Sequence, residues 1–361
     1  MNVEPEAKPI KCLVWDLDDT VWHGILLEGS VELRPDAAEV IRTLDGRGIL
    51  HAIASRNDHH MAMAQLATFG LADFFLCPQI NWQAKSLSVK QISEALNLGM
   101  DSFAFIDDQP FERAEVQHAH PEVFCIDANH DLLSLLDLPR MTPRFISQEQ
   151  SRRRHMYQQD LKRRGAEESF VGPAEDFLAS LGMNLKIGPA EGGDLARLEE
   201  LTVRTSQLNS TGYTYSIDEL DELRRSPDHL LLVAELDDKF GWYGKIGLAL
   251  VEALTDRWIL KLLIVSCRVM SRGVGTVFLR DIMRRAQDAG VRLQAEFQKT
   301  DRNRIMMVTY RFAGFREVTR RDELVVLEHE LETIPEAPSY MTVLDTDLGH
   351  PKAAVFRRDK S

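Results

Sequence analysis

An apolar run that ends in two aspartates, spaced two residues apart, most constrains how this chain folds. Residues 13–15 are Leu, Val and Trp, and Asp16 and Asp18 follow them. Val14, Asp16 and Asp18 share a parity on an extended strand, but the chain must leave the sheet near Asp16 to free both carboxylates. Acids at the carboxyl end of a strand can hold Mg2+, and one of them can attack phosphorus. Because Mg2+ prefers octahedral oxygen ligands, the sequence should supply a second acidic group.

The second acidic group follows another apolar run, residues 103–106, and consists of Asp107 and Asp108. Parallel strands that end in acids deliver them to the same edge of a sheet. Ser55, which ends a third apolar run, and Lys85 lie between the two acid pairs in the sequence. One aspartate pair alone is more often a solvated turn, whereas four pieces in this order favour phosphate chemistry.

The order of acid pair, hydroxyl, lysine and acid pair resembles the four motifs of the haloacid dehalogenase (HAD) superfamily of phosphotransferases. The resemblance implies that Asp16 is the nucleophile and that Asp18 is the general acid and base. It also implies that Ser55 binds a phosphoryl oxygen, and that Lys85 neutralises charge and keeps Asp16 ionised. The side chains expected to bind the phosphorylated substrate are Thr20, Arg56 and Asn57. The expected cofactor is Mg2+, with these ligands: Asp16, Asp18 through its carbonyl, Asp107 and Asp108.

Length and composition set the outer bounds. A chain of 361 residues with 44% hydrophobic content is long enough for two cores. Its four cysteines form no CxxC pair, which fits free thiols in a reducing cytosol and implies no zinc site. Residues 1–6 lack a basic segment followed by an apolar one, and no apolar run approaches about 18 residues, so we expect a cytoplasmic protein without a membrane partner. A net charge of -13 argues against a nucleic-acid partner.

Hydrophobic patterning predicts an α/β protein with two domains. In the first domain, 1–145, strands alternate with helices and right-handed crossovers build a HAD-like, doubly wound parallel sheet. Residues 22–29 leave room only for a small flap, which keeps the site open to a large partner. The predicted strands are 11–16, 50–55, 73–77, 103–107 and 122–126, and the predicted helices are 36–47, 58–70, 86–97 and 110–118.

A basic helical linker is expected over 146–182, with basic triplets at 152–154 and 162–164. It is either a solvated helix or a docking patch for an acidic carrier protein. A second α/β domain is expected over 183–335, with a C-terminal tail at 336–361. The pieces expected around it are helices at 174–182 and 193–207, and strands at 229–236, 246–254 and 257–265.

A glycine turn follows the strand 258–265 and precedes a helix that begins near Thr276. Glycines let backbone amides approach an anion at a helix N-terminus, although a turn for tight packing explains them equally well. Together with Arg302 and Asn303 and with residues 310–315, the turn resembles the acetyl-CoA and phosphopantetheine motifs of the GNAT family of N-acetyltransferases. The resemblance implies a GNAT-like second domain whose turn holds a pyrophosphate and whose preceding strand runs beside the thioester. The residues expected to bind pantetheine are Arg268, Arg272, Gly273, Gly275 and Asn303.

The combination of both halves resembles the FkbH-like proteins of polyketide biosynthesis over roughly 11–330. The stretches that carry this resemblance are 11–18, 78–82, 105–112 and 266–273. It implies a bifunctional glyceryltransferase and phosphatase that takes D-glycerate from 1,3-bisphosphoglycerate, a small phosphorylated three-carbon substrate, dephosphorylates it and loads it as a thioester on an acyl carrier protein. Asp19, where the family pattern predicts asparagine, and His23 depart from that pattern near the flap.

Glyceryl transfer needs a thiol. Cys77 is the first candidate because it is expected near the carboxyl end of a first-domain strand, and Cys267, beside the glycine turn, is the second. Cys12 should be core, and Cys125 lies in no recognised motif. Two other functions remain open: a HAD phosphatase of a soluble metabolite with a degenerate acetyltransferase fold, and a second half that only docks the carrier.

Overall fold

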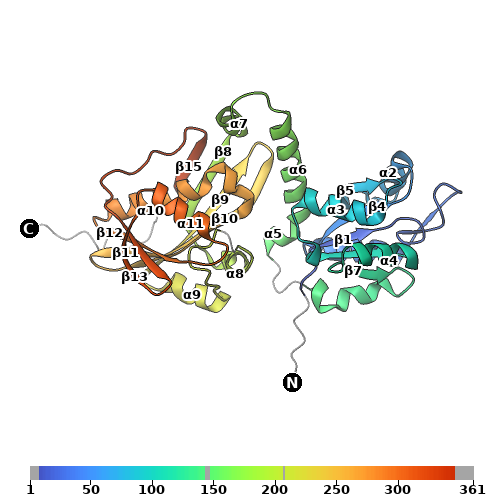
Figure 1. Ribbon diagram of the computed structural model, residues 1–361, viewed down its shortest axis with the longest axis horizontal. Helices are drawn as coiled ribbons and strands as arrows, with labels where there is room; N and C mark the ends of the chain where they lie inside the picture. The colour runs from blue at the N-terminus through green and yellow to red at the C-terminus, as the bar shows by residue number, and fades with distance from the viewer. Residues whose placement is uncertain (1–7, 143–146, 206–207, 346–361) are drawn as a thin grey trace, which may run out of the picture. The chain divides into compact units, whose positions relative to one another are not determined.

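The computed structural model of the protein describes residues 8–142, 147–205 and 208–345. The chain divides into two compact units, Met1–Gly165 and Ala166–Ser361 (Figure 1). Each unit has its own hydrophobic core. The predicted basic linker, 146–182, is therefore shared between them. It forms α5 (Gln148–Ser151), α6 (Arg153–Ser169) and α7 (Ala174–Leu181).

Unit 1 is built on a sheet with the strand order β5-β4-β1-β6-β7, in which every pairing is parallel. The chain builds outward from β1 through β4 to β5, then returns to the other side of β1 for β6 and β7. The order reverses between β1 and β6, and ligands of open α/β sheets bind at such a switch point. This confirms the predicted doubly wound sheet. The strands are β1 Cys12–Trp15, β4 Leu50–Ser55, β5 Phe75–Ile80, β6 Phe103–Asp107 and β7 Phe124–Asp127.

Alternate side chains of β1 enter apolar layers on opposite faces of the sheet, as the two-residue period of a strand requires. Leu13 and Trp15 pack with α1 and α2, whereas Cys12 and Val14 pack with α3 and α4. The central strand is buried on both faces for this reason. The helices are α1 Pro35–Gly46, α2 His59–Thr68, α3 Lys85–Leu96 and α4 Pro110–Ala119.

A short ribbon follows β1, made of β2 (Trp22–His23) and β3 (Glu32–Leu33). Trp22 is fully buried, while Ile25 and Leu27 between the two strands are exposed. The ribbon is thus anchored at its base and extends into solvent, which is the small flap that the sequence predicts.

Unit 2 contains a sheet with the order β13-β14-β12-β11-β10-β9-β8-β15. Its pairings are antiparallel except β11 with β12 and β8 with β15. One face is covered by α7, α10 and α11, and the other by α8 and α9, which confirms a second α/β domain. The strands are β8 Met183–Pro189, β9 His229–Asp238, β10 Gly241–Ala253, β11 Arg257–Val265, β12 Arg292–Gln298, β13 Arg316–Arg321, β14 Leu324–His329 and β15 Met341–Asp345. The helices are α8 Leu195–Arg204, α9 Ile217–Arg225, α10 Val274–Asp288 and α11 Arg304–Phe312.

Several segments differ from the sequence prediction. The helix expected over 193–207 is α8, Leu195–Arg204, and residues 206–207 of that prediction lie outside the described ranges. Strand β5 runs to Ile80 and not only to residue 77, because it lies at the edge of the sheet, where Pro78 leaves no ladder hydrogen bond unmade. Met341–Asp345, within the predicted tail, adds β15 to the sheet. Among the described residues, no helix is long and apolar enough to cross a membrane.

Candidate active site

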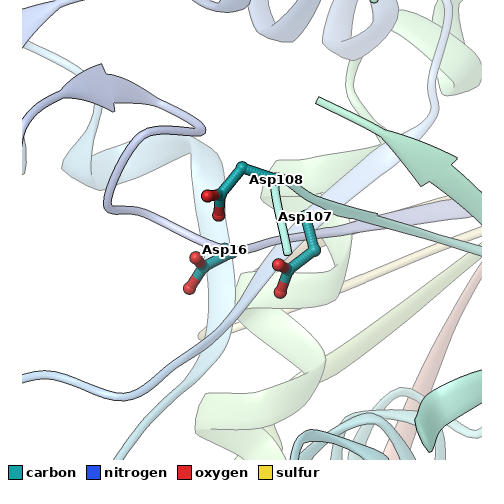
Figure 2. A group of neighbouring side chains, drawn as sticks. All are labelled: Asp16, Asp107 and Asp108. Atoms are coloured by element: carbon teal, nitrogen blue, oxygen red, sulfur yellow. The ribbon is translucent and has the colours of Figure 1, made fainter. Parts of the chain in front are cut away.

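Three aspartates gather where β1 and β6 end. Trp15 pairs with Ile106, so the residues that follow, Asp16 and Asp107, leave the sheet at the same level. The amide of Asp16 also donates to the carbonyl of Ile106 at 2.9 Å. Carboxylate oxygens of Asp16, Asp107 and Asp108 all lie within 4.8 Å of one another, and Figure 2 shows them converging.

Lys85, the first residue of α3, brings an ammonium group to this cluster. Its Nζ lies 2.5 Å from Oδ2 of Asp107 and 2.9 Å from Oδ1 of Asp16. Burial alone would lower the pKa of Lys85, but the two carboxylates outweigh burial and raise that pKa above its ordinary value. Lys85 therefore stays charged beside both carboxylates.

The single ammonium group of Lys85 does not balance the negative charge of the three carboxylates in the cluster. Burial, followed by the nearby charge of Asp16, raises the pKa of Asp107 to about 7 despite Lys85. Burial and Asp16 also raise the pKa of Asp108. Oδ1 of Asp108 is buried without a hydrogen-bond partner among the described residues. Three carboxylates facing one ammonium, with an acceptor oxygen left over, fit a hard divalent cation such as Mg2+.

Asp18 lies outside this carboxylate cluster and is held by its own donors. Its Oδ1 accepts from Nε1 of Trp22 at 2.8 Å and from the amide of Leu26 at 3.1 Å. Its Oδ2 accepts from Nδ2 of Asn57 at 3.0 Å. Burial raises the pKa of Asp18, against the lowering effect of these donors. A carboxyl group that is fixed in place and inclined to hold a proton is suited to general acid and base chemistry.

The remaining predicted site residues of unit 1 differ in their burial and in their bonding partners. Ser55 ends β4 beside β1 and is buried, and the Oγ1 of Thr20 is buried without a hydrogen-bond partner among the described residues. Asn57 bonds Asp18, as described, which gives it a positioning role in addition to the predicted substrate contact. Arg56 pairs with Glu112 at 3.1 Å and is partly exposed, so it keeps surface for an anion.

The sequence prediction missed two residues that position this site. Trp22 donates to Asp18, and its place four residues after Asp18 in an otherwise apolar flap base was a usable signal. Glu115 of α4 accepts from the amide of Ser86 at 3.1 Å and from its hydroxyl, and so anchors the first turn of α3 that carries Lys85. No local pattern reveals Glu115, because the contact depends on two helices meeting in space.

The cysteines differ in how they are placed. Cys77 lies within β5 at a register shift, with φ 47°, and packs against the layer that holds Cys12. It is not at the carboxyl end of its strand, contrary to the prediction, because β5 continues for three residues to Ile80. Burial raises the pKa of Cys77, of Cys12 well above its ordinary value, and of Cys125 to about 11, whereas Cys267 is exposed.

Gly273 and Gly275 are two of the residues expected to bind pantetheine; Gly273 forms the turn that the sequence predicts, and Gly275 lies in the first turn of the helix that follows. Gly273 has φ 75° and precedes α10, which starts at Val274. Arg268, which is partly buried, donates to the carbonyl of Tyr243 at 3.0 Å.

Arg272 and Asn303, by contrast, do not match the expected ligand contacts. Arg272 is buried and pairs with Glu167 at 2.8 Å. Asn303 is fully buried, and its amide donates to backbone carbonyls. The turn therefore exists, but these two side chains serve the protein interior.

The fold and this site define a two-unit α/β protein with a carboxylate and lysine cluster at the switch point of its first sheet. No protein-family model matches the chain, and no curated protein matches it.

Several solved structures resemble parts of the chain. The N-terminal part of a Bacteroides fragilis protein, which contains a phosphatase domain and is complexed with Mg, is 28% identical with a TM-score of 0.33; the match covers 37% of this chain and 39% of that one. PaiA N-acetyltransferase from Thermoplasma acidophilum, in complex with coenzyme A, is 16% identical over 40% of this chain and 97% of that one, with a TM-score of 0.31. A GNAT-family acetyltransferase from Streptococcus pneumoniae is 21% identical over 40% of this chain and 98% of that one, with a TM-score of 0.31.

Proposed function

We propose that unit 1 is a Mg2+-dependent phosphatase of the HAD type with Asp16 as its nucleophile. The observation that carries the proposal is the position of Asp16, which ends the central strand at the switch point and lies 2.9 Å from Lys85 and within 4.8 Å of two further carboxylates. A carboxylate that lies beside a lysine ammonium and a candidate cation site is equipped to attack a phosphate ester.

Each side chain of the site has its own role in the proposed reaction. Asp16 attacks phosphorus, the bond to the leaving oxygen breaks, and an aspartyl-phosphate forms. Asp18 gives its proton to the leaving oxygen and then takes one from the water that hydrolyses the aspartyl-phosphate. Lys85, with the hydroxyl of Ser55, stabilises charge on the transferred group. Mg2+ held by Asp16, Asp107 and Asp108 would shield the phosphate from the attacking carboxylate.

The first prediction tests the nucleophile. Asp16→Asn should lower phosphate release from a small phosphate monoester by more than about a hundredfold, because an amide cannot form the acyl phosphate. Asp101→Asn is the control, since Asp101 is only partly buried and precedes β6, at the end of that strand opposite to Asp107. Release within about tenfold of wild type by Asp16→Asn would remove Asp16 from this role.

EDTA should stop phosphate release by the wild type, and added Mg2+ should restore it.

At a finer level, the proposal names the substrate and the partner. The FkbH-like stretches support 1,3-bisphosphoglycerate as the substrate, because it offers a phosphate ester to Asp16 and an acyl phosphate to a thiol. The second unit supports a carrier protein as the acceptor of the glyceryl thioester. The alternative, a phosphatase of a soluble metabolite, needs no acyl transfer. Intact mass spectrometry of enzyme, 1,3-bisphosphoglycerate and pantetheinylated carrier separates them, since only the first adds a glyceryl mass to the carrier.

The transient thiol is best assigned to Cys267. Cys267 is exposed, whereas Cys77, the first choice from the sequence, lies within a strand and has a raised pKa. A thiolate is the reacting species, so a buried thiol of raised pKa reacts slowly. Wild-type enzyme with 1,3-bisphosphoglycerate should gain a hydroxylamine-labile mass that Cys77→Ala keeps and Cys267→Ala loses. Persistence of the adduct in both variants would exclude both thiols.

A further inference from the structure

Strand β12 pairs with only the first part of β11. The two strands pair in parallel from Arg257 with Arg292 to Leu260 with Ala295, and no further. A register shift at Lys261 in the pairing with β10 marks the point where β12 diverges. The backbone groups of β11 beyond this point are buried and need partners, because an unpaired buried amide is strongly unfavourable.

The chain itself supplies those partners. The amide of Ser210 donates to the carbonyl of Leu263 at 3.1 Å, and the amide of Leu263 donates to the hydroxyl of Ser210 at 3.0 Å. The amide of Val265 donates to the carbonyl of Leu208 at 3.1 Å. Asn209 faces Ile264 as an isolated antiparallel bridge. Residues 208–210 therefore act as a short inserted strand on β11.

The inserted strand is also held from the side of β12. The amide of Gln298, the last residue of β12, donates to the carbonyl of Ser210 at 3.0 Å. Nδ2 of Asn303 donates to the carbonyls of Asn209 at 3.0 Å and Gln298 at 2.8 Å. Asn209, Ser210 and Asn303 are at most 1% exposed. The gap between the diverging strands is thus filled by buried residues.

We infer that residues 208–210 permanently occupy the groove between β11 and β12, so that an extended amide-bearing arm, such as that of coenzyme A or of a pantetheinylated carrier, does not bind along β11. This rests on the carrier-loading part of the proposed function and corrects the groove expected from the glycine turn. It does not involve the phosphatase site.

The inserted strand, residues 208–210, has an advantage over a free pantetheine arm in binding the edge of β11. It belongs to the same chain, so its effective concentration at β11 is about millimolar or higher, whereas a free arm arrives from dilute solution. The arm would also have to release Asn303 from the carbonyls that it holds. Acyl chemistry on a carrier thiol must then take place outside this groove.

Residue-resolved hydrogen exchange on the full chain tests the inference, with coenzyme A itself as the probe. Without ligand, the amides of Leu263, Val265 and Gln298 should exchange as slowly as that of Leu248 inside the paired sheet. Coenzyme A at about 1 mM should leave these rates unchanged. Fast exchange without ligand, or a change on adding coenzyme A, overturns the inference.

A variant tests the contact that holds the strand. Asn303→Ala should speed exchange at Gln298 by about fivefold or more, because it removes hydrogen bonds that close the gap. Asn184→Ala, which removes a side-chain hydrogen bond to Asp237 elsewhere in the same sheet, should not. If Asn303→Ala fails to fold, Ser210→Ala should speed exchange at Leu263 instead. Unchanged exchange in a folded variant contradicts the role given to residues 208–210. Phosphate release by the same samples reports separately on Asp16.

Discussion

At the scale of single residues, the site depends on how Asp18 is held. One oxygen faces the indole of Trp22 from the flap base, and the other faces Asn57 from the loop after β4. The carboxyl group therefore cannot rotate without losing a donor. Proton transfer depends on a fixed donor to acceptor geometry, so in the proposed reaction both neighbours should influence catalysis although neither needs to touch phosphate.

Trp22→Phe should lower kcat by about tenfold with little change in KM, because the ring stays in the core while the donor to Asp18 is lost. Single-turnover assays should show the aspartyl-phosphate persisting longer. Trp242→Phe is the matched control, since Trp242 donates to Glu235 at 2.5 Å in unit 2. A wild-type kcat in Trp22→Phe would show that the indole does not position Asp18.

His51 gives unit 1 a defined response to acid. It is fully buried in β4, where Nε1 of Trp15 donates to its Nδ1 at 3.0 Å. Burial lowers the pKa of His51 to about 3. The unfolded chain binds a proton at about pH 6.5 and the folded chain does not, so the unfolded state is favoured as pH falls between these values.

The free energy of unfolding should therefore fall by up to about 1.4 kcal/mol per pH unit below about pH 6.5 because of His51 alone. Urea unfolding of unit 1 at several pH values, compared with His51→Gln, isolates this contribution, because other groups titrate equally in both proteins. Identical pH slopes would mean that His51 becomes protonated within the fold.

At the scale of elements, local sequence was enough wherever an apolar run ended in polar residues. Asp16, Ser55 and Asp107 could be placed at one sheet edge because parallel strands put their carboxyl ends together. The position of Cys77 relative to the end of its strand could not be predicted, because a register shift and an edge proline extend β5 beyond the apolar run. The partners that Arg272 and Asn303 have in the structure, Glu167 and residues 208–210, could not be predicted because they are remote in sequence.

The turn before α10 allows a matched comparison of two glycines. Gly273→Ala should destabilise unit 2 by about 1–2 kcal/mol, because φ is 75° there, where an L side chain is strained, and because the added Cβ would lie 2.7 Å from the Tyr340 hydroxyl. Gly275→Ala should be neutral or stabilising, since its added Cβ would meet only Val265 at 3.7 Å and a helical alanine is favoured over glycine. Chemical unfolding of both variants measures the difference. Equal effects would rule out backbone strain as the reason for Gly273.

At the scale of the whole molecule, the two cores are separate. In the proposed function Mg2+ binds folded unit 1 and not its unfolded form, so it should raise the melting temperature of that unit alone. Calorimetry should resolve two transitions, of which only one moves with Mg2+. In Asp16→Asn this shift should shrink, because one carboxylate ligand is lost. A shift of both transitions by Mg2+ would show a second cation site or coupled unfolding.

The strand order of unit 1 also affects how the chain folds while the ribosome synthesises it. Strand β1 is made first but needs β6, fourth of the five strands in chain order, to cover its second edge. Until β6 emerges, a nascent chain exposes an apolar central strand and has only one of the three clustered aspartates, Asp16. Non-local pairing of this kind folds slowly and is open to aggregation in the interval. Synthesis stalled before Phe103 should therefore yield chains that bind holdase chaperones and cannot bind a cation at Asp16.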